Sequence, residues 1–176
     1  MKNLFKHLKT VHTHRKYVRK ACWKMGLFWQ GLLHDLSKYS ITELKICKYY
    51  IGTKSPHQVC REMIGYSPSW ISHYHHNKHH FEYWYDYEMA TKKIVPVDMP
   101  DRYIKEMFCD RIAASKTYNR ENYTQDSPLR YLLNSTAQEK MTDTTYRKLL
   151  FLLKMLAEKG EEKTFAYLKS HKNLEF

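Results

Sequence analysis

The sequence predicts an all-α protein with a single domain. Glycine and proline are scarce, at five residues each, so long stretches can continue without a break. Apolar residues recur at the three- and four-residue spacing of a helix, and no segment shows the strict alternation of a strand. A chain of 176 residues fits one domain with a substantial core. We therefore expect one helical bundle over residues 1–176.

Four helices are predicted in the first part of the chain. The first has a continuous apolar face that ends where Gly26 breaks the pattern. The third begins at Ser40-Ile-Thr-Glu43, which fits a capping box, in which the two side chains bond each other's backbone N–H groups. The predicted ranges are 4–25, a short segment running into His34-Asp35, 40–50 and 57–65.

Proline marks the start of three later helices, because its fixed φ suits the first helical turn. Residues 92–98, which contain Pro96, and the polar residues 119–126 are predicted to form loops. Gly160 is predicted to hinge the last two helices. The later predicted helices are one from 67 that carries residues 73–80, then 100–118, a short one from 127, 142–159 and 161–170.

The chain is strongly basic, with 30 Lys and Arg against 18 Asp and Glu and a net charge of +12. Residues 1–34 carry eight of these basic residues and no acid. This balance favours polyanionic or phosphorylated partners, and fifteen tyrosines and four tryptophans offer rings that could stack on bases. Nucleic acid is therefore one predicted partner. A solvated basic face is the alternative interpretation.

The sequence predicts a soluble cytoplasmic protein with no membrane partner. No apolar run approaches the roughly 20 residues that span a bilayer, and the N-terminus lacks the apolar segment and cleavage site of a signal peptide. The four cysteines are widely spaced and form no C-x-x-C pair, which is typical of reduced thiols. The pattern does not predict an oligomeric state.

Side chains that bind metals occur on three of the predicted helices. His34 and Asp35 are adjacent, so an imidazole nitrogen and a carboxylate can reach one cation. His14 is placed to share the core-facing side of the first helix. Asp110 lies within an apolar helical stretch, where an acid is costly unless it is paired or metal-bound. A surface position for His14, and an ion pair with Arg111 for Asp110, are the alternatives.

Five histidines fall within residues 73–80. Three of them follow the i, i+3, i+7 spacing of one helical face. Neutral imidazoles on such a face can bind a metal, and protonated ones can hold phosphate oxygens. A hydrated helix surface is the alternative. We expect His76 and His80 to bind metal, and His73, His79 and Glu82 to bind substrate or assist catalysis.

The order of these residues resembles that of the HD-domain superfamily of metal-dependent phosphohydrolases, an all-helical family. His34-Asp35-Leu36-Ser37-Lys38 is similar to its H-D-apolar-small-K signature, and His14 and Asp110 match its first and last ligands. The resemblance covers about residues 10–120, with C-terminal helices over about 127–172. It implies that His14, His34, Asp35 and Asp110 bind one or two divalent ions (Fe, Mn, Zn, Ni or Mg). Lys38 is a point charge that could hold a phosphate oxygen and balance the charge that builds in the transition state.

A narrower resemblance is to an uncharacterised group of small HD-like proteins from bacteria and phages. Its H-x-x-H-N-x-H-H-x-E box is matched from His73 to Glu82. Its M-P segment followed by E-M-x-x-D is matched at Met99-Pro100 and from Glu106 to Asp110. This group implies no substrate. HD proteins with two metals take their extra histidines from well-separated points, so a second metal and substrate contact both remain open for the box.

These patterns lead to three hypotheses on function. The first is a phosphohydrolase that acts on a nucleotide or another small phosphoester through a metal-activated water. The second is a basic nucleic-acid-binding protein with a structural or vestigial metal site. The third is an oxygen-using di-iron enzyme, a chemistry found in a minority of HD relatives. Glu82 and Glu106 are further candidates for orienting ligands or for acid–base work.

Overall fold

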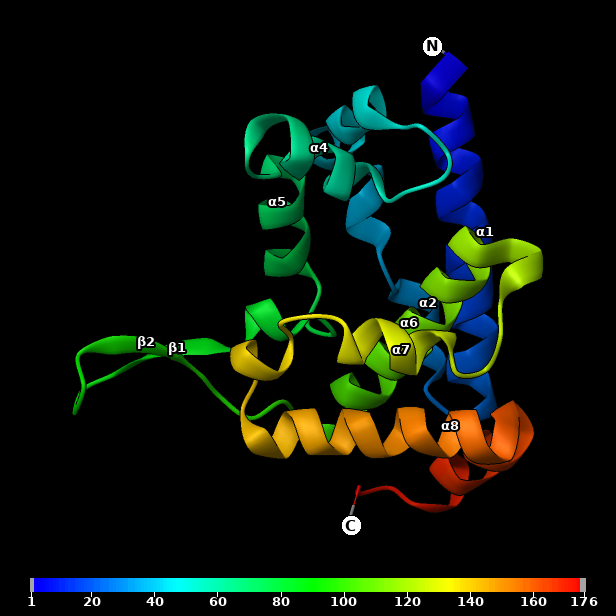
Figure 1. Ribbon diagram of the computed structural model, residues 1–176, viewed down its shortest axis with the longest axis vertical. Helices are drawn as coiled ribbons and strands as arrows, with labels where there is room; N and C mark the ends of the chain where they lie inside the picture. Colours follow the sequence, from blue (N-terminus) through cyan, green and yellow to red (C-terminus); the bar gives the residue numbers. More distant parts are fainter. Residues whose placement is uncertain (1, 175–176) are drawn as a thin grey trace.

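Helix α1 (Lys2–Lys24) forms one side of the molecule (Figure 1). The structure, a computed structural model, describes residues 2–174. Helix α6 (Asp101–Asn119) packs along α1, and Val18 and Cys22 of α1 join the hydrophobic core there. Both long helices agree with the predicted ranges. The two helices provide the rigid frame on which the rest of the chain is placed.

A tight turn brings the next helix back against α1. Gly26 adopts a positive φ of 79°, a conformation that glycine reaches without steric cost. Helix α2 (Phe28–Leu33) then approaches α1 closely at Gly31, where an added β-carbon would lie 2.8 Å from Cβ of Cys22. This contact places the His-Asp pair, which follows α2, beside the middle of α1. The predicted short helix is confirmed.

Helix α8 (Asp143–Ser170) lies across the lower end of α1 in Figure 1 and, with α7 (Ser127–Leu133), forms the base of the molecule. Gly160 interrupts α8 with φ 79° and ψ 170°, so the predicted hinge is confirmed. Aliphatic and aromatic side chains from α6 and α8 form the fully buried centre of the core. They include Ile104, Phe108, Leu149, Leu152 and Leu156.

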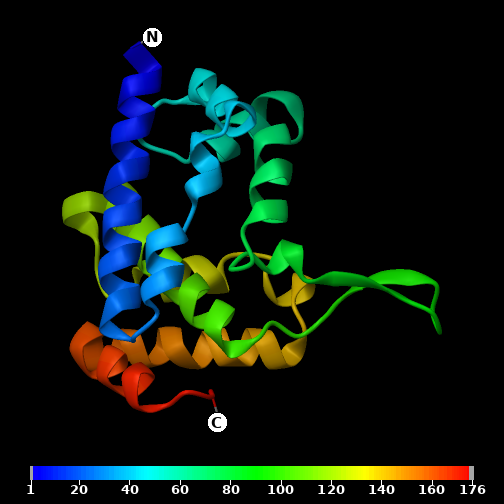
Figure 2. The same ribbon diagram turned by 180° about the vertical axis from the view of Figure 1, so that it is seen from behind.

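A layer of short helices stands opposite α1 (Figure 2). Ser40 accepts a hydrogen bond from the backbone N–H of Glu43, as the predicted capping box requires. The Glu43 side chain, however, turns into the protein interior, so only half of the box forms. The helix predicted over 40–50 is divided into one α-helical and one 3₁₀ turn. The elements of this layer are η1 (Leu36–Tyr39), α3 (Ile41–Leu44), η2 (Lys45–Tyr49), α4 (Pro56–Ile64) and α5 (Pro68–His76).

The end of α5 differs from the prediction. The helix begins after a Ser67 cap but stops at His76, because Asn77 adopts an extended conformation with φ −128° and ψ 100°. The Asn77 side-chain amide donates to the carbonyl of His73 and to Oγ of Ser37, both at 2.7 Å. This amide therefore fixes a turn in which the last two histidines of the cluster lie outside the helix. The prediction of one helix through residues 73–80 is wrong.

A β-hairpin projects from the helical body (Figures 1 and 2). Strand β1 (Tyr85–Glu88) pairs with β2 (Lys93–Pro96) in antiparallel register, with Tyr85 opposite Pro96. The loop predicted over residues 92–98 is wrong in this part. Both strands have four residues and are largely exposed, so they lack the apolar alternation by which a half-buried strand is detected. The remaining single-turn 3₁₀ helices are η3 (Phe81–Tyr83), η4 (Arg120–Asn122) and η5 (Gln138–Lys140).

The predicted all-α fold is confirmed, because helices dominate and the hairpin is a two-stranded addition. Within residues 2–174, no helix combines the length and the apolar character that a membrane span requires. The architecture brings the end of α2, the end of α5 and the middle of α6 toward one buried region beside α1. The candidate site lies in that region.

Candidate metal centre

Four segments of the chain contribute histidines and carboxylates to one buried cluster. Helix α1 supplies one histidine, the turn after α2 supplies the His-Asp pair, α5 and the turn after it supply three histidines, and α6 supplies two acids. We call these residues the metal cluster. Its members are His14, His34, Asp35, His73, His79, His80, Glu106 and Asp110.

The first ligand set consists of the four residues that were predicted to converge. Nε2 of His14 lies 2.9 Å from Oδ1 of Asp110, and Nε2 of His34 lies 3.3 Å from Oδ2 of Asp35. One ligand atom from each residue lies within 4.8 Å of the other three. This spacing matches that of four atoms around one ion with bonds of about 2 Å. The predicted convergence is confirmed.

The second ligand set uses Asp35 again, together with three histidines of the 73–80 cluster. Nε2 of His73 and Nε2 of His79 lie 3.3 and 3.5 Å from Oδ1 of Asp35. Nε2 of His80 lies 2.8 Å from Nε2 of His73. The two oxygens of Asp35 thus face different sets, Oδ2 toward His34 and Oδ1 toward His73. This carboxylate is placed to bridge two adjacent sites.

An unusual backbone turn directs Asp35 into the cluster. Asp35 has φ 55° and ψ 27°, in the left-handed region that few residues with a β-carbon adopt. Arg15 of α1 holds the turn, because its guanidinium donates to the carbonyls of His34 at 2.8 Å and Leu32 at 2.9 Å. Backbone conformations of this kind persist where surrounding contacts fix them, often at functional sites. Here they place the carboxylate between the two ligand sets.

Several buried atoms of the cluster have no hydrogen-bond partner within residues 2–174, although one of them forms an ion pair with Lys38. They are both carboxylate oxygens of Asp35 and Nε2 of His79. A buried carboxylate without hydrogen bonds costs free energy unless a cation compensates for its charge. Lys38 supplies part of that charge, with Nζ 2.6 Å from Oδ2 of Asp35. The imidazole and carboxylate groups of the cluster, and the atoms among them that lack hydrogen bonds, therefore fit a metal site, and these buried groups could hold a metal ion.

Two further carboxylates orient the imidazole rings from behind. Oε1 of Glu106 lies 2.9 Å from Nδ1 of His34 and 3.2 Å from Nδ1 of His79. Oε2 of Glu43 lies 2.8 Å from Nδ1 of His73. A carboxylate that accepts a hydrogen bond from Nδ1–H keeps the proton on Nδ1, so that Nε2 carries the lone pair for a metal, and it also fixes the ring plane. Glu106 was predicted as an orienting group; Glu43 was missed, because its position in the sequence is explained by the helix cap.

The charges in the first set reinforce one another. Burial disfavours the charged form of both His34 and Asp35. Their mutual attraction, with Asp110 and Glu106 near the histidine and Lys38 near the aspartate, raises the pKa of His34 and lowers the pKa of Asp35 well beyond their usual ranges. Burial also raises the pKa of Glu106, but its bonds to histidines outweigh this effect and lower the pKa to about 2. His34 and Asp35 of the first set therefore both favour their ionised forms.

Three other histidines of the cluster, His14, His73 and His80, favour the neutral form. Burial lowers the pKa of His80 well below its usual value, and neighbouring histidines lower it further. Burial also lowers the pKa values of His73 and His14, although nearby carboxylates oppose the shift. A neutral imidazole has the free lone pair that a metal requires. These three side chains are therefore prepared to bind a cation without first losing a proton.

The structure excludes one predicted ligand. His76 is exposed, and its Nδ1 lies 2.7 Å from the carbonyl oxygen of Ser72 on its own helix. Its i, i+4 relation to His80 does not create a shared face, because α5 ends at His76. His73 and His79, predicted as substrate or catalytic groups, lie in the second ligand set instead. His80 lies there as predicted.

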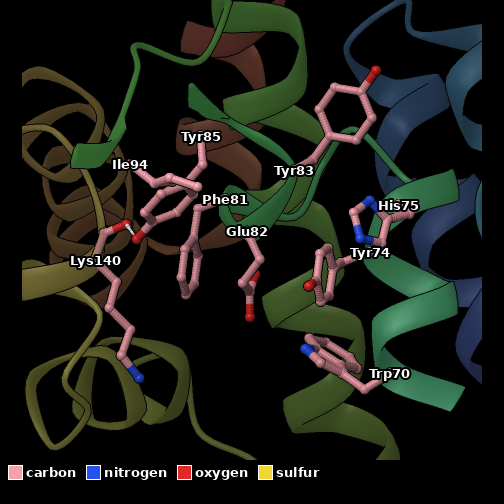
Figure 3. Close-up of a pocket in the computed structure, with 9 residues that line it drawn as sticks. All are labelled: Trp70, Tyr74, His75, Phe81, Glu82, Tyr83, Tyr85, Ile94 and Lys140. Carbon is pink, nitrogen blue, oxygen red and sulfur yellow. Dashed lines mark hydrogen bonds between the residues drawn. The ribbon is translucent and has the colours of Figure 1, made fainter. Parts of the chain in front are cut away.

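The structure also places two other residues that were predicted to belong to the site, Glu82 and Asp110. Glu82 lies outside the metal cluster, among the residues that line a neighbouring pocket (Figure 3). Burial raises the pKa of its carboxyl, although Trp70 and two arginines oppose the shift. Asp110 pairs with His14, and within residues 2–174 Arg111 makes no ion pair with it. The alternative interpretation of Asp110 as an Arg111 partner is therefore wrong.

Comparison with known proteins identifies the family but not an activity. A family model described as a family of unknown function (DUF5662) matches residues 3–155. This span includes all four segments that contribute to the metal cluster. No curated protein and no solved structure matches the chain. The chain belongs to the DUF5662 family.

Proposed function

We propose that this protein is a metal-dependent phosphohydrolase with an HD-like centre that holds two divalent ions. The observation that carries the proposal is the position of Asp35, whose two buried oxygens face separate ligand sets, with Lys38 paired to one of them. The first ion would be held by His14, His34, Asp35 and Asp110, and the second by Asp35, His73, His79 and His80.

The donor chemistry narrows the choice of metal. Five imidazole nitrogens and two carboxylates suit iron, manganese, zinc or nickel better than magnesium, which prefers oxygen ligands and water. When bound, a pair of such ions lowers the pKa of water and stabilises the attacking and leaving oxygens of a phosphoryl group. A nucleotide or another small phosphoester is the proposed class of substrate.

Lys38 is the residue proposed to bind the substrate phosphate. Burial disfavours the ammonium, but Asp35 and Asp110 outweigh this effect and raise the pKa of Lys38. Its side chain is 20% exposed, whereas that of Asp35 is 1% exposed. The Lys38 side chain is therefore more open to solvent than the carboxylate that it pairs with, and we expect its ammonium to contact a phosphoryl oxygen. There it would offset the negative charge that develops as the phosphoester bond breaks.

Metal analysis combined with a substrate panel tests the proposal. The purified protein should contain two transition-metal ions per chain and, with manganese, iron, zinc or nickel, hydrolyse at least one nucleotide or p-nitrophenyl phosphoester. The Lys38→Met variant should retain both ions and lose at least about tenfold in kcat/KM, whereas Lys45→Met, which changes an exposed lysine, should match the wild type. A fully metal-loaded protein without activity on mono-, di- and triphosphoesters would contradict the proposed reaction.

Nucleic-acid binding is a second candidate, because one surface supports it. The outward side of α1 carries exposed basic residues and no acid. Phosphate contacts by such residues give an affinity that falls steeply with salt. Single- and double-stranded oligonucleotides titrated at several salt concentrations would measure this affinity. The residues concerned are Lys6, Lys9, Lys16, Arg19 and Lys20.

A further inference from the structure

An aromatic pocket lies next to the second ligand set. Its volume is about 540 Å³, which exceeds that of a purine base. In Figure 3, Phe81 and Tyr85 stand on one side and Trp70 and Tyr74 on the other. The carboxylate of Glu82 points into the space between these two pairs of rings. We call this the aromatic pocket.

The aromatic pocket and the metal cluster share a wall. The ring centre of Trp70 lies 4.7 Å from that of His80 and 5.3 Å from that of His73. Glu82 follows His80 by two residues in the turn after α5. Trp70 therefore lines the aromatic pocket and also contacts two histidines of the second ligand set. A ligand in the pocket would lie beside the metal cluster.

One carboxylate oxygen of Glu82, in the aromatic pocket, lacks a hydrogen-bond donor. Oε2 of Glu82 is buried and has no hydrogen-bond partner within residues 2–174. Leaving such an acceptor unpaired is costly, so a ligand that donates to it gains affinity and specificity. The flanking rings provide stacking surfaces for a planar heterocycle. The combination fits a flat base with N–H groups on one edge.

Charge argues against an organic cation in the same place. Aromatic rings beside a carboxylate can also bind ammonium groups. Here, however, the Arg61 guanidinium lies 5.1 Å above the Trp70 ring, and the Lys78 ammonium lies 5.7 Å from the Tyr83 ring centre. Lys140 also lines the pocket. A neutral base avoids the repulsion that a second cation would meet.

We propose that the aromatic pocket binds the base of a guanine nucleotide and selects it as the substrate of the metal centre. The Glu82 carboxylate offers Oε2, which has no partner within residues 2–174, and a second oxygen, which has two lone pairs although the carboxylate also interacts with the Trp70 side chain. Together the two oxygens match the adjacent N1–H and 2-amino donors of guanine. Adenine presents an acceptor nitrogen beside its amino group and would leave one oxygen facing a lone pair. That the bound nucleotide is a substrate rests on the proposed phosphohydrolase function. Binding of the base in the pocket does not depend on that function.

Nucleosides test the pocket independently of catalysis, because they have no phosphate to hydrolyse. Equilibrium dialysis of guanosine, inosine and adenosine against the full-length protein should show guanosine bound at least about tenfold more tightly than adenosine. Inosine, which lacks the 2-amino group, should fall between them. The Glu82→Gln variant should lose most of this preference and keep the wild-type metal content. Glu158→Gln, an exposed carboxylate on α8, is the matched control.

A second variant separates stacking from hydrogen bonding. Tyr74→Leu should weaken the binding of both guanosine and adenosine, each by about tenfold, and leave their ratio unchanged. Circular dichroism and thermal unfolding verify that each variant is folded. Equal affinity for the two nucleosides, or an unchanged preference in folded Glu82→Gln, would overturn the pocket assignment. These outcomes do not depend on any enzyme assay.

Activity measurements then distinguish the two proposals. If both hold, kcat/KM for a guanine nucleotide exceeds that for the adenine analogue, and Glu82→Gln removes the difference. Guanosine preference without hydrolysis of any guanine nucleotide supports the pocket and contradicts the phosphohydrolase. Hydrolysis without base preference supports the phosphohydrolase and contradicts the pocket.

Discussion

His73 and His80 face each other through their Nε2 atoms at 2.8 Å in the buried part of the metal cluster. The Nδ1 atom of His73 lies 2.8 Å from a carboxylate oxygen of Glu43, which accepts a hydrogen bond from Nδ1–H. The Nε2 atom of neutral His73 therefore carries a lone pair directed at His80. Unless His80 donates a proton to it, two lone pairs meet, and a shared cation removes that repulsion. The arrangement is that of two ligands of one ion.

Replacing single histidines should therefore remove specific ions. His80→Ala should lose the ion held by the second set and keep the ion held by His14, His34, Asp35 and Asp110, because that set retains all its donors. His76→Ala is the matched control, since this exposed histidine lies outside the cluster. Inductively coupled plasma mass spectrometry should find one ion per chain in the first variant and two in the control. Loss of an ion from the control would show that the assignment of ligands is wrong.

Asp35→Ala should have a larger effect than any single histidine variant. Its two oxygens face both ligand sets, so its loss removes a negatively charged donor from each. The variant should bind no metal and show no phosphohydrolase activity. Asp86→Ala removes an exposed aspartate from the hairpin and should retain two ions. A folded Asp35→Ala protein with one tightly bound ion would show that Asp35 does not bridge the sites.

The first ligand set could be predicted from the sequence because local signals and a family resemblance agree on it. Helical periodicity allowed His14 to lie on a buried face, and Asp110 was an acid within an apolar helix. These signals left a surface position for His14 and an ion pair for Asp110 open. The order of the residues, which resembles that of the HD-domain superfamily, favoured metal binding, and the structure brings all four residues together.

The members of the second set could not be predicted, because they depend on where helix α5 ends, and the sequence does not show that end. A continuous helix would have placed His76 beside His80, but Asn77 leaves the helix and bonds to Ser37, forty residues away. A tertiary hydrogen bond of this kind has no periodic signature. The role of Glu43 could not be predicted for the same reason, because its contact with His73 is also between residues far apart in the sequence. The resemblance to HD proteins did not supply these contacts.

The two orienting carboxylates should differ in how many sites they affect. Glu106 contacts histidines of both sets, whereas Glu43 contacts His73 in the second set. Glu106→Gln should weaken the binding of both ions, by about 10–100-fold each, because the ring positions of His34 and His79 are lost. Glu43→Gln should weaken the second ion by a similar factor and leave the first unchanged. Competition with a chromophoric chelator measures the affinities for both ions. If the two variants weakened both ions equally, the assignment of Glu106 to both sets and of Glu43 to the second set would be contradicted.

Gly160 provides a test of the hinge in the C-terminal helix. Its φ of 79° and ψ of 170° lie in a region that essentially only glycine occupies, and a β-carbon there would lie 3.0 Å from Oε1 of Gln125. Gly160→Ala should therefore destabilise the protein by about 1–3 kcal/mol. For a chain of this size, each kcal/mol corresponds to a fall of about 2–4 °C in Tm. Lys159→Ala, at an exposed neighbouring position, should change Tm by less than about 2 °C.

The last prediction concerns the protons released when metal binds. The carboxylates around His34 outweigh its burial and raise its pKa well above 6.5, so the metal-free protein carries a proton on this ring at neutral pH. Binding of a metal at Nε2 must expel that proton. The affinity for the first ion should therefore rise with pH, by up to about tenfold per unit, for as long as His34 remains protonated in the metal-free state.

Two ligands of the second ion, His73 and His80, should contribute no comparable proton release, and this difference can be measured. Burial lowers the pKa values of His73 and His80, so both rings are already neutral before the metal binds. Calorimetric titrations at one pH, in buffers with different ionisation enthalpies, give the number of protons released per ion. His80→Ala, which retains the first site, should still release about one proton, whereas His14→Ala, which weakens that site, should release fewer. Proton release confined to the second ion would contradict the charge distribution that surrounds Asp35, because it would require neutral His34 and protonated His73 or His80.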